Sequence, residues 1–280
     1  MPRRRPGPAG GRPSGGRPGH QRSRPTRAGA GTKPRGLGGE RVEGRHAVRE
    51  LLLAGRRRAK EVVLAAGMDH ADILDDIVEL ANELKVPVRE LGRSKFDALA
   101  RTEASQGVLA EAAPLPEHDL ATLISTDGGQ VPFLVALDGV TDPGNLGALL
   151  RTAECAGVTG VVLPRHRAVH VTPTVTKAAA GAVEHLPMSL VGGLPSAVGQ
   201  MKEAQVWVVG LDETGDARLD ALDLAQPVCL VLGAEGRGLS RLVRQRSDAV
   251  ARIPLRGQLN SLNVAAAGAV ACFEVVRQRG

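Results

Sequence analysis

Apolar residues recur along the chain in two alternating periods from Gly44 onward. Between residues 46 and 111, stretches with helical spacing alternate with short β-rich runs. The expected helices are 46–54, the stretch that carries Ile73, Ile77, Leu80 and Leu84, and 94–100, for which Ser94 is the expected N-cap. The expected strands are 61–65, a run around Val86, Val88 and Leu91, and 107–111. This order predicts a small α/β domain of residues 41–113.

A second, larger α/β domain is predicted for residues 131–280, after a linker at 114–130 that is rich in Pro and Gly. Its apolar runs are typical of strands buried on both faces of a parallel sheet; they are 131–137, 158–163, 206–209, 228–232 and, more weakly, 249–255. Helical stretches are expected at 147–155, 173–184, 194–203, 239–246 and 263–278. The last of these is apolar on more than one face, so it must be covered on both sides.

Positive charge is concentrated at the N-terminus. Residues 1–40 hold 10 of the 36 Lys and Arg residues but one of the 30 Asp and Glu, together with 11 of the 35 Gly and 7 of the 18 Pro. Such a segment lacks the apolar positions needed to offset its ordering entropy, so we expect a disordered tail. Its charge favours a polyanion such as nucleic acid, and a solvated tail without a dedicated partner is the alternative.

Several classes of protein are disfavoured. The first residues, MPRRRPGPAGG, lack the apolar run of a secretory signal, and the longest apolar stretch, 263–273, is too short for a membrane span. His166 and His170 have no third ligand nearby, so no metal site is predicted. The cysteines are odd in number, far apart and set among aliphatic residues, as expected of reduced core thiols in the cytoplasm; they are Cys155, Cys229 and Cys272.

Unusual polar sequence follows the first strand of the larger domain. In LDGVTDPGNLGALLRTAECAG, at 137–157, a turn at 142–144 leads into a helix that Asn145 can cap. Arg151 lies less than two helical turns further on, so both side chains can reach the same end of that helix. In an open parallel sheet, this carboxyl end is where ligands bind.

Two other strand ends carry comparable sequence. In LVLGAEGRGLS, at 230–240, three glycines permit a tight loop that holds Glu235, but position 241 is Arg, which weakens a dinucleotide-binding fingerprint. In IPLRGQLNSLNVAAAGAVACFE, at 253–274, Asn260, Ser261 and Asn263 crowd one strand-to-helix boundary. Turn and cap chemistry explains any one of the three segments, whereas all three together indicate a site.

Together, NLGALLR at 145–151, LVLGAEGRG at 230–238 and IPLRGQLNSLNVAAA at 253–267 resemble the three signature motifs of the SpoU class of RNA ribose 2′-O-methyltransferases, in the SPOUT superfamily. The preceding segment, from GRHAVRELL to ASQGVLAEA, resembles the ribosomal-protein-like substrate-binding domain of the 23S rRNA guanosine branch.

The resemblance implies a catalytic domain with a C-terminal trefoil knot, a homodimer, no metal, 23S rRNA as partner and S-adenosylmethionine as cofactor. By position, the cofactor contacts would be Gly210, Gly233, Ile253 and Leu262. The catalytic polar set would be Asn145, Arg151, Glu235, Ser261 and Asn263. The family proposal makes Arg151 the proton acceptor, yet a guanidinium is a poor base, so clamping of phosphate or ribose is the safer role. Glu235 could orient Arg151 or Asn145, or merely pair with Arg237 or Arg241.

Other functions remain open at this point. The same chemistry occurs in a tRNA guanosine branch, against which the extra N-terminal domain argues, and in resistance-type enzymes that modify an rRNA adenosine. A non-catalytic RNA-binding assembly protein is a further possibility, although Asn145 and Arg151 are present. With one Trp, three Phe and no Tyr, base stacking on aromatic side chains is not expected to carry RNA recognition.

Overall fold

The computed structural model describes residues 36–103, 105–166 and 170–280. The tail predicted at 1–40 therefore lies mostly outside the described residues. Its last part, residues 36–40, contradicts the expected disorder: Leu37 is 1% exposed, and the Gly39 amide donates to the Val171 carbonyl over 2.8 Å. Leu37 packs into the core of the larger domain. Burial of this side chain offsets the entropy lost when residues 36–40 become ordered.

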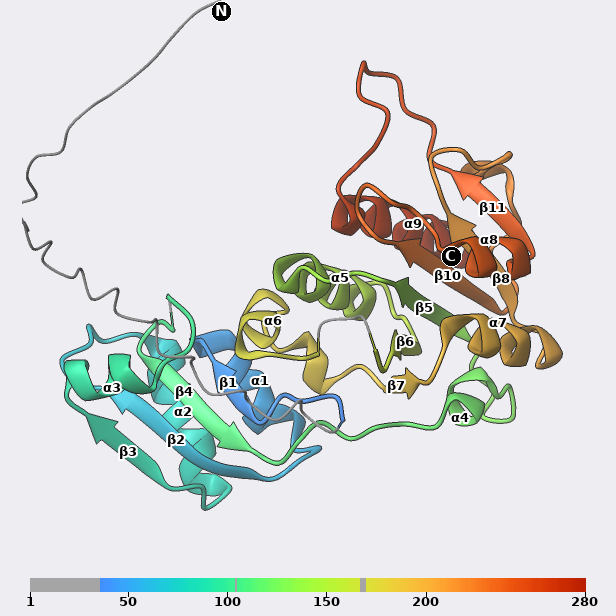
Figure 1. Ribbon diagram of the computed structural model, residues 1–280. Coiled ribbons are helices and arrows are strands. Elements are labelled where there is room, and N and C mark those ends of the chain that lie inside the picture. The colour runs from blue at the N-terminus through green and yellow to red at the C-terminus, as the bar shows by residue number, and fades with distance from the viewer. Residues whose placement is uncertain (1–35, 104, 167–169) are drawn as a thin grey trace, which may run out of the picture. The chain divides into compact units, whose positions relative to one another are not determined.

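The smaller domain is a four-stranded sheet with helices on both faces (Figure 1). Its strands are β1 (Arg41–Glu43), β4 (Val108–Ala112), β2 (Ala59–Ala65) and β3 (Val88–Leu91), in that order across the sheet, and only β2 and β3 pair in parallel. Its helices are α1 (Arg45–Ala54), α2 (Asp72–Glu83) and α3 (Arg93–Leu99). The predicted elements are confirmed, with β1 in addition.

The start of α3 differs from the prediction. The N-cap is Gly92, whose carbonyl accepts from the amides of Lys95 and Phe96, and Ser94 lies inside the first turn. Phe96 is fully buried against β2 and β4. The burial of this ring fixes the helix, so a side-chain cap from Ser94 is not required.

The larger domain is a seven-stranded parallel sheet in the order β7-β6-β5-β10-β8-β11-β9. Its strands are β5 (Phe133–Asp138), β6 (Gly160–Pro164), β7 (Met188–Val191), β8 (Trp207–Leu211), β9 (Ala217–Arg218), β10 (Val228–Gly233) and β11 (Ala249–Arg252). The five predicted strands are confirmed. β7 and β9 are additional, and both lie at edges, where short strands with few apolar residues suffice.

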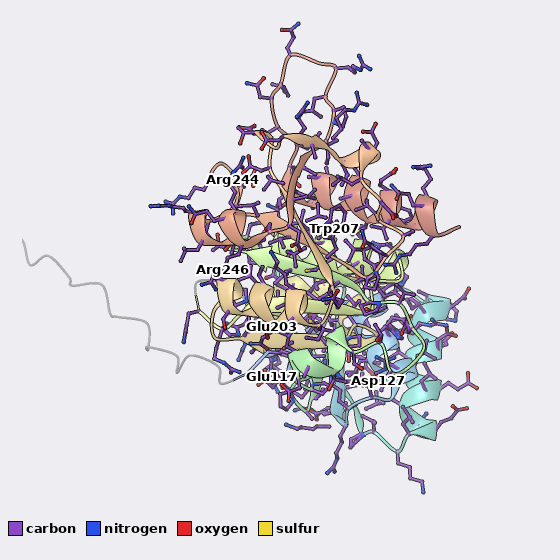
Figure 2. The ribbon with its side chains drawn as sticks, turned by 90° about the vertical axis from the view of Figure 1, so that its right-hand side faces the viewer. Glu117, Asp127, Glu203, Trp207, Arg244 and Arg246 are labelled. Atoms are coloured by element: carbon purple, nitrogen blue, oxygen red, sulfur yellow. The ribbon has the colours of Figure 1, made fainter. Side chains whose placement is uncertain are left out.

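Helices cover both faces of this sheet, because alternate strand residues point to opposite sides. On one side pack α5 (Pro143–Cys155), α6 (Pro173–Ala178) and α9 (Val264–Arg279). On the other pack α4 (Leu120–Ile124), α7 (Leu194–Glu203) and α8 (Arg241–Arg246). Glu203 of α7 and Arg246 of α8 lie along this second side (Figure 2), and Arg246 donates to the Pro195 carbonyl over 2.7 Å. No helix among the described residues is long and apolar enough to cross a membrane.

The segment predicted as a linker contains α4. Leu120, Leu123 and Ile124 are buried against the sheet, so this stretch belongs to the core of the larger domain rather than spanning open space. The five-residue helix is too short to show helical periodicity in the sequence.

A buried ion pair joins the segment between α1 and β2 to the segment between α6 and β7. The guanidinium of Arg57 pairs with both carboxylate oxygens of Glu184, at 2.8 and 2.6 Å, and the two side chains are 3% and 1% exposed. Arg57 also donates to the carbonyls of Gly39 and Ala113. These extra partners help to offset the desolvation of the Arg57 guanidinium.

Candidate active site

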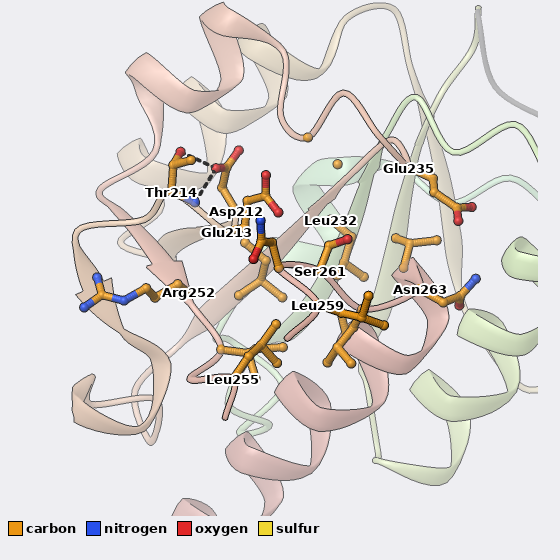
Figure 3. A pocket seen from close by; sticks show the side chains of 18 of the residues that line it. Asp212, Glu213, Thr214, Leu232, Glu235, Arg252, Leu255, Leu259, Ser261 and Asn263 are labelled. Atoms are coloured by element: carbon orange, nitrogen blue, oxygen red, sulfur yellow. Dashed lines mark hydrogen bonds between the residues drawn. The ribbon is translucent and has the colours of Figure 1, made fainter. Parts of the chain in front are cut away.

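The carboxyl ends of β8, β10 and β11 open into one pocket of about 1180 Å³. Figure 3 shows side chains from the loop after β8, from the loop after β10 and from residues 252–263 around it. The volume lies just above the usual range for small-molecule pockets, about 300–1,000 Å³, so the pocket is large enough for a small-molecule cofactor.

Three of the four predicted cofactor residues line this pocket. They are Gly233, Ile253 and Leu262. The structure does not bring the fourth, Gly210, to the pocket wall. Gly210 follows Val206 and Val208 on the side of β8 that faces α7 and α8, and a Cβ there would lie 2.5 Å from Leu239 Cδ1. Strand alternation therefore directs this position under α8.

Gly233 permits a close approach of backbone to backbone. A Cβ at this position would lie 2.2 Å from the carbonyl carbon of Gly238, so a side chain cannot be accommodated without opening the loop. The loop closes on itself through the Ala234 amide, which donates to the Gly238 carbonyl over 3.1 Å. The pocket thus has a wall of bare backbone after β10, as the glycine pattern predicted.

Three of the predicted catalytic side chains form one hydrogen-bonded line. Asn263 Nδ2 donates to Asn145 Oδ1 over 2.9 Å, and Asn145 Nδ2 donates to Glu235 Oε2 over 3.2 Å. These residues come from α5, the loop after β10 and the start of α9, which are far apart in sequence. Of the two predicted roles for Glu235, the structure brings it to Asn145.

Asn263 also caps the last helix. Its Oδ1 accepts from the amides of Ala265 and Ala266, at 2.9 and 3.4 Å. This fixes which atom of the amide faces the helix, so Nδ2 must face Asn145.

The predicted N-cap role of Asn145 is wrong. Asp142 is the N-cap of α5, and its Oδ1 accepts from the Asn145 amide over 2.7 Å. Pro143 at the first helical position supplies a preset φ, so the helix begins before Asn145. The Asn145 side chain is therefore free to join Glu235 and Asn263.

Arg151 and Ser261 stand apart from this line. Arg151 is exposed on α5, two turns after the helix start, and it makes no hydrogen bond or ion pair with any residue in the described ranges. Ser261 is exposed on the pocket wall, in the same segment as Leu262. Ser261 thus lines the pocket, whereas Arg151 does not.

A carboxylate that sequence reasoning missed also lines the pocket. Asp212 follows β8 directly and lies close to Thr214 (Figure 3), with its side chain 13% exposed. Partial burial disfavours the charged form of Asp212, but hydrogen bonds from Thr214 and Arg244 outweigh it and lower the pKa below its ordinary value. The signal in the sequence was its position at a strand end, outside all three motifs.

The cysteines only partly follow the prediction. Cys229 and Cys272 are buried, and burial raises the pKa of the Cys272 thiol to about 12 and that of Cys229 further. Cys155 is exposed, because it is the last residue of α5 and lies on the face opposite the core. Among the residues that the structure describes, His, Cys, Asp and Glu side chains form no group of three that could hold a metal ion.

With this geometry in view, sequence comparison is decisive. The SpoU rRNA methylase family matches residues 132–273, and the family of RNA 2′-O ribose methyltransferase substrate-binding domains matches residues 41–118. The chain belongs to the SpoU rRNA methylase family. The three motifs of the sequence and the pocket at the three strand ends are thus features of one known class of RNA methyltransferase, and the protein is an enzyme of that class.

Curated relatives of this SpoU protein match over nearly their whole length. The chain is 42% identical over 243 residues to a 23S rRNA (guanosine-2′-O-)-methyltransferase of Pseudomonas aeruginosa, covering 86% of this chain and 97% of the relative. It is 35% identical over 240 residues to a putative TrmH family tRNA/rRNA methyltransferase of Staphylococcus saprophyticus, covering 85% and 95%.

Solved structures show the same two-part architecture. The SpoU methyltransferase AviRb from Streptomyces viridochromogenes, in complex with S-adenosylmethionine, matches with a TM-score of 0.71 and 26% identity, over 85% of this chain and 90% of that one. An S-adenosylmethionine-bound rRNA methyltransferase from Sinorhizobium meliloti matches with a TM-score of 0.70 and 26% identity, over 85% and 86%. The fold class predicted from the sequence is confirmed.

Proposed function

We propose that this protein transfers a methyl group from S-adenosylmethionine to the ribose 2′-hydroxyl of a guanosine in 23S rRNA. The observation that carries the proposal is the line Asn263–Asn145–Glu235 at the pocket, in a chain 42% identical to an enzyme named for that reaction. We assign residues 41–113 to RNA binding and 131–280 to catalysis.

The pocket suits S-adenosylmethionine in size and in chemistry. Gly233 presents bare backbone, Ile253 and Leu262 add apolar surface, and carboxylates lie beside them. An adenosyl group needs such a combination of apolar wall and convergent polar atoms. When bound, the cofactor supplies a methyl group attached to a sulfonium, which is an electrophile.

The polar side chains then act on the RNA. Arg151 binds a phosphate or ribose oxygen, where its charge stabilises the developing alkoxide, and at this exposed position the proton of the 2′-hydroxyl passes to solvent water. The Asn145 side chain is held at both amide atoms, because Nδ2 donates to Glu235 and Oδ1 accepts from Asn263. It therefore keeps its orientation while the ribose enters. Ser261, exposed on the pocket wall, is a further contact for substrate.

We further propose a C-terminal trefoil knot in the catalytic domain. The chain runs from β8 to β10, which lies between β8 and β5, and then to β11 on the far side of β8. After β11 it returns through residues 253–263 to α9, which contacts α5 and β10. This return past the loop after β10 supports a threaded connection.

We also propose that two copies of this chain associate through α9. Val270 and Phe273 on this helix are 46% and 50% exposed, while its other face is buried on α5 and β10. An uncovered apolar face of this kind suits a partner surface. Light scattering should show a dimer that Phe273→Glu dissociates, whereas Leu242→Glu, at a position 54% exposed on α8, leaves it intact. A Phe273→Glu protein that stays dimeric would reject this interface.

A 23S rRNA substrate and reduced thiols both indicate the cytoplasm as the site of action, which we propose for this enzyme.

The reaction is tested with purified protein, tritiated S-adenosylmethionine and either a 23S rRNA fragment or bulk tRNA. We expect label on a guanosine ribose of the 23S fragment. Arg151→Ala should lose transfer, whereas Arg151→Lys should retain part of it, because lysine keeps the positive charge but lacks the forked donors of the guanidinium. Label only in tRNA, or on an adenosine, would assign the protein to another branch. No transfer to either RNA by a folded preparation that binds the cofactor would leave a non-catalytic RNA-binding role.

A further inference from the structure

Asp212 is held in the pocket wall by one of its two carboxylate oxygens. Oδ1 accepts from the Thr214 amide over 2.9 Å and from Thr214 Oγ1 over 2.6 Å, and it lies 3.0 Å from Nη1 of Arg244. The Asp212 amide donates to the Ala251 carbonyl over 3.0 Å, which ties this turn to β11. The carboxylate therefore has a fixed orientation.

The other oxygen of Asp212 is left for a ligand. Within the described part of the chain, no residue donates a hydrogen bond to Oδ2. It lies 2.7 Å from the point that a Cβ on Gly238 would occupy, so it lies beside the glycine loop after β10 at the pocket wall. A side chain at 238 would cover this oxygen, and Gly238, at φ +62°, leaves it open.

The charge around Asp212 selects the kind of donor. Because Arg244 already neutralises the carboxylate through Oδ1, a second cation at Oδ2 would meet the field of that guanidinium. A neutral hydroxyl has no such penalty. An acidic side chain at a strand end that accepts from ribose hydroxyls is a recurring way to hold a nucleoside in α/β sheets.

We propose that Asp212 Oδ2 accepts a hydrogen bond from a ribose hydroxyl of the bound cofactor and makes the pocket selective for ribonucleosides over deoxynucleosides. This inference rests on the proposed function, and it adds to the three sequence motifs a specificity-determining residue that lies outside them. Thr214 and Arg244 are positioning residues, because they act by fixing the carboxylate.

The test measures binding rather than turnover. The probes are S-adenosylhomocysteine, 5′-methylthioadenosine, which lacks the amino acid, and the 2′-deoxy and 3′-deoxy forms of the latter, each titrated by calorimetry. For wild-type protein, removal of the hydroxyl that binds Oδ2 should weaken affinity about 10- to 100-fold, the effect of one lost hydrogen bond to a charged group. The other deoxy form should lose less.

Asp212→Ala should reduce the ribo-to-deoxy affinity ratio to about one, because the hydroxyl then loses its acceptor. This ratio compares two ligands on one protein, so a general loosening of the turn does not change it. Glu213→Ala is the matched control, since it removes the neighbouring carboxylate and should keep the ratio. Asp212→Asn, whose Oδ1 still accepts from Thr214, covers the case in which the alanine variant does not fold, and it should lower the ratio because Nδ2 then replaces Oδ2 and cannot accept from the hydroxyl.

An unchanged ratio in both Asp212 variants, an equal fall in Glu213→Ala, or a wild-type ratio near one would overturn the inference. So would an Asp212→Ala protein that loses affinity for S-adenosylhomocysteine but not for 5′-methylthioadenosine, since that result places the donor in the amino-acid part. Absence of wild-type binding to S-adenosylhomocysteine would instead overturn the proposed function itself.

Discussion

The substitution Asn263→Asp separates the two interactions of this side chain, the cap of α9 and the hydrogen bond to Asn145. In the folded protein, Oδ1 caps α9 and Nδ2 donates to Asn145. An aspartate keeps the first interaction and removes the second, because a carboxylate has acceptors but no donor at neutral pH. The substitution therefore tests whether the site depends on the cap or on the link to Asn145.

The magnitudes predict a small net effect on stability and a large effect on activity. Asp is as good an N-cap as Asn, and a negative charge at the start of a 16-residue helix adds about 0.3–1 kcal/mol. At the other end, a carboxylate oxygen would face Asn145 Oδ1 where a donor now lies at 2.9 Å. The lost bond is worth about 0.5–1.5 kcal/mol, and the freed Asn145 amide can rotate away from Glu235, for which a roughly 100-fold loss in rate is typical of a misplaced group.

The assay combines thermal unfolding with single-turnover methyl transfer. Because the gain from the charge at the helix start and the loss of the bond to Asn145 nearly cancel, Asn263→Asp should differ from the wild type in stability by no more than about 1 kcal/mol, yet it should transfer methyl at least about tenfold more slowly. Asn263→Ala, the control, loses both the cap and the bond to Asn145, so it should be about 2 kcal/mol less stable as well as slow. Wild-type rates in Asn263→Asp would show that the link to Asn145 has no role in catalysis, and a loss of stability equal to that of the alanine variant would refute the cap argument.

Three further expectations concern the rest of the molecule. Arg57→Met leaves the buried Glu184 carboxylate unpaired and should lower the free energy of unfolding by about 3–5 kcal/mol in denaturant titrations; a change under about 1 kcal/mol would contradict the burial of the pair. Ellman's reagent should react quickly with Cys155 alone in the native protein and with all three cysteines after unfolding, and rapid native reaction of a second thiol would show that the other two are accessible. Deletion of residues 1–33 should weaken rRNA binding and flatten its salt dependence, by roughly 0.7 per lost phosphate contact, without changing the methylated nucleotide; an unchanged slope would remove the tail from RNA binding.

The strands and long helices were predictable because burial of both sheet faces leaves continuous apolar runs. β10, for example, is confirmed within a residue of the run at 228–232. The short elements were not, since α4 and β7 contain too few residues to show a period, and their positions depend on contacts with the finished sheet. Cap assignments failed for a related reason: Asp142 and Asn145 are both good caps, and only the packing of α5 decides between them.

The sequence predicted which polar residues belong to the candidate site but not which of them hydrogen-bond to one another. Motif resemblance gave Asn145, Glu235 and Asn263, whereas their order in one hydrogen-bonded line follows from how α5 and α9 pack. Gly210 does not line the pocket, because alternation along β8 directs this position to the side of α7 and α8. Asp212 was missed because a single carboxylate at a strand end has no spacing pattern of its own.

The hydrogen-bonded line has a single direction, and it connects the N-terminus of α9 with Glu235. The amides at the start of α9 donate to Asn263, Asn263 donates to Asn145, and Asn145 donates to Glu235. Each dipole is aligned with the next, so the partial positive charge of the helix N-terminus is relayed toward the carboxylate, and each bond strengthens its neighbours. Because Asn263 can orient Asn145 only where α9 lies against α5, this polar line depends on the packing of the C-terminal helix.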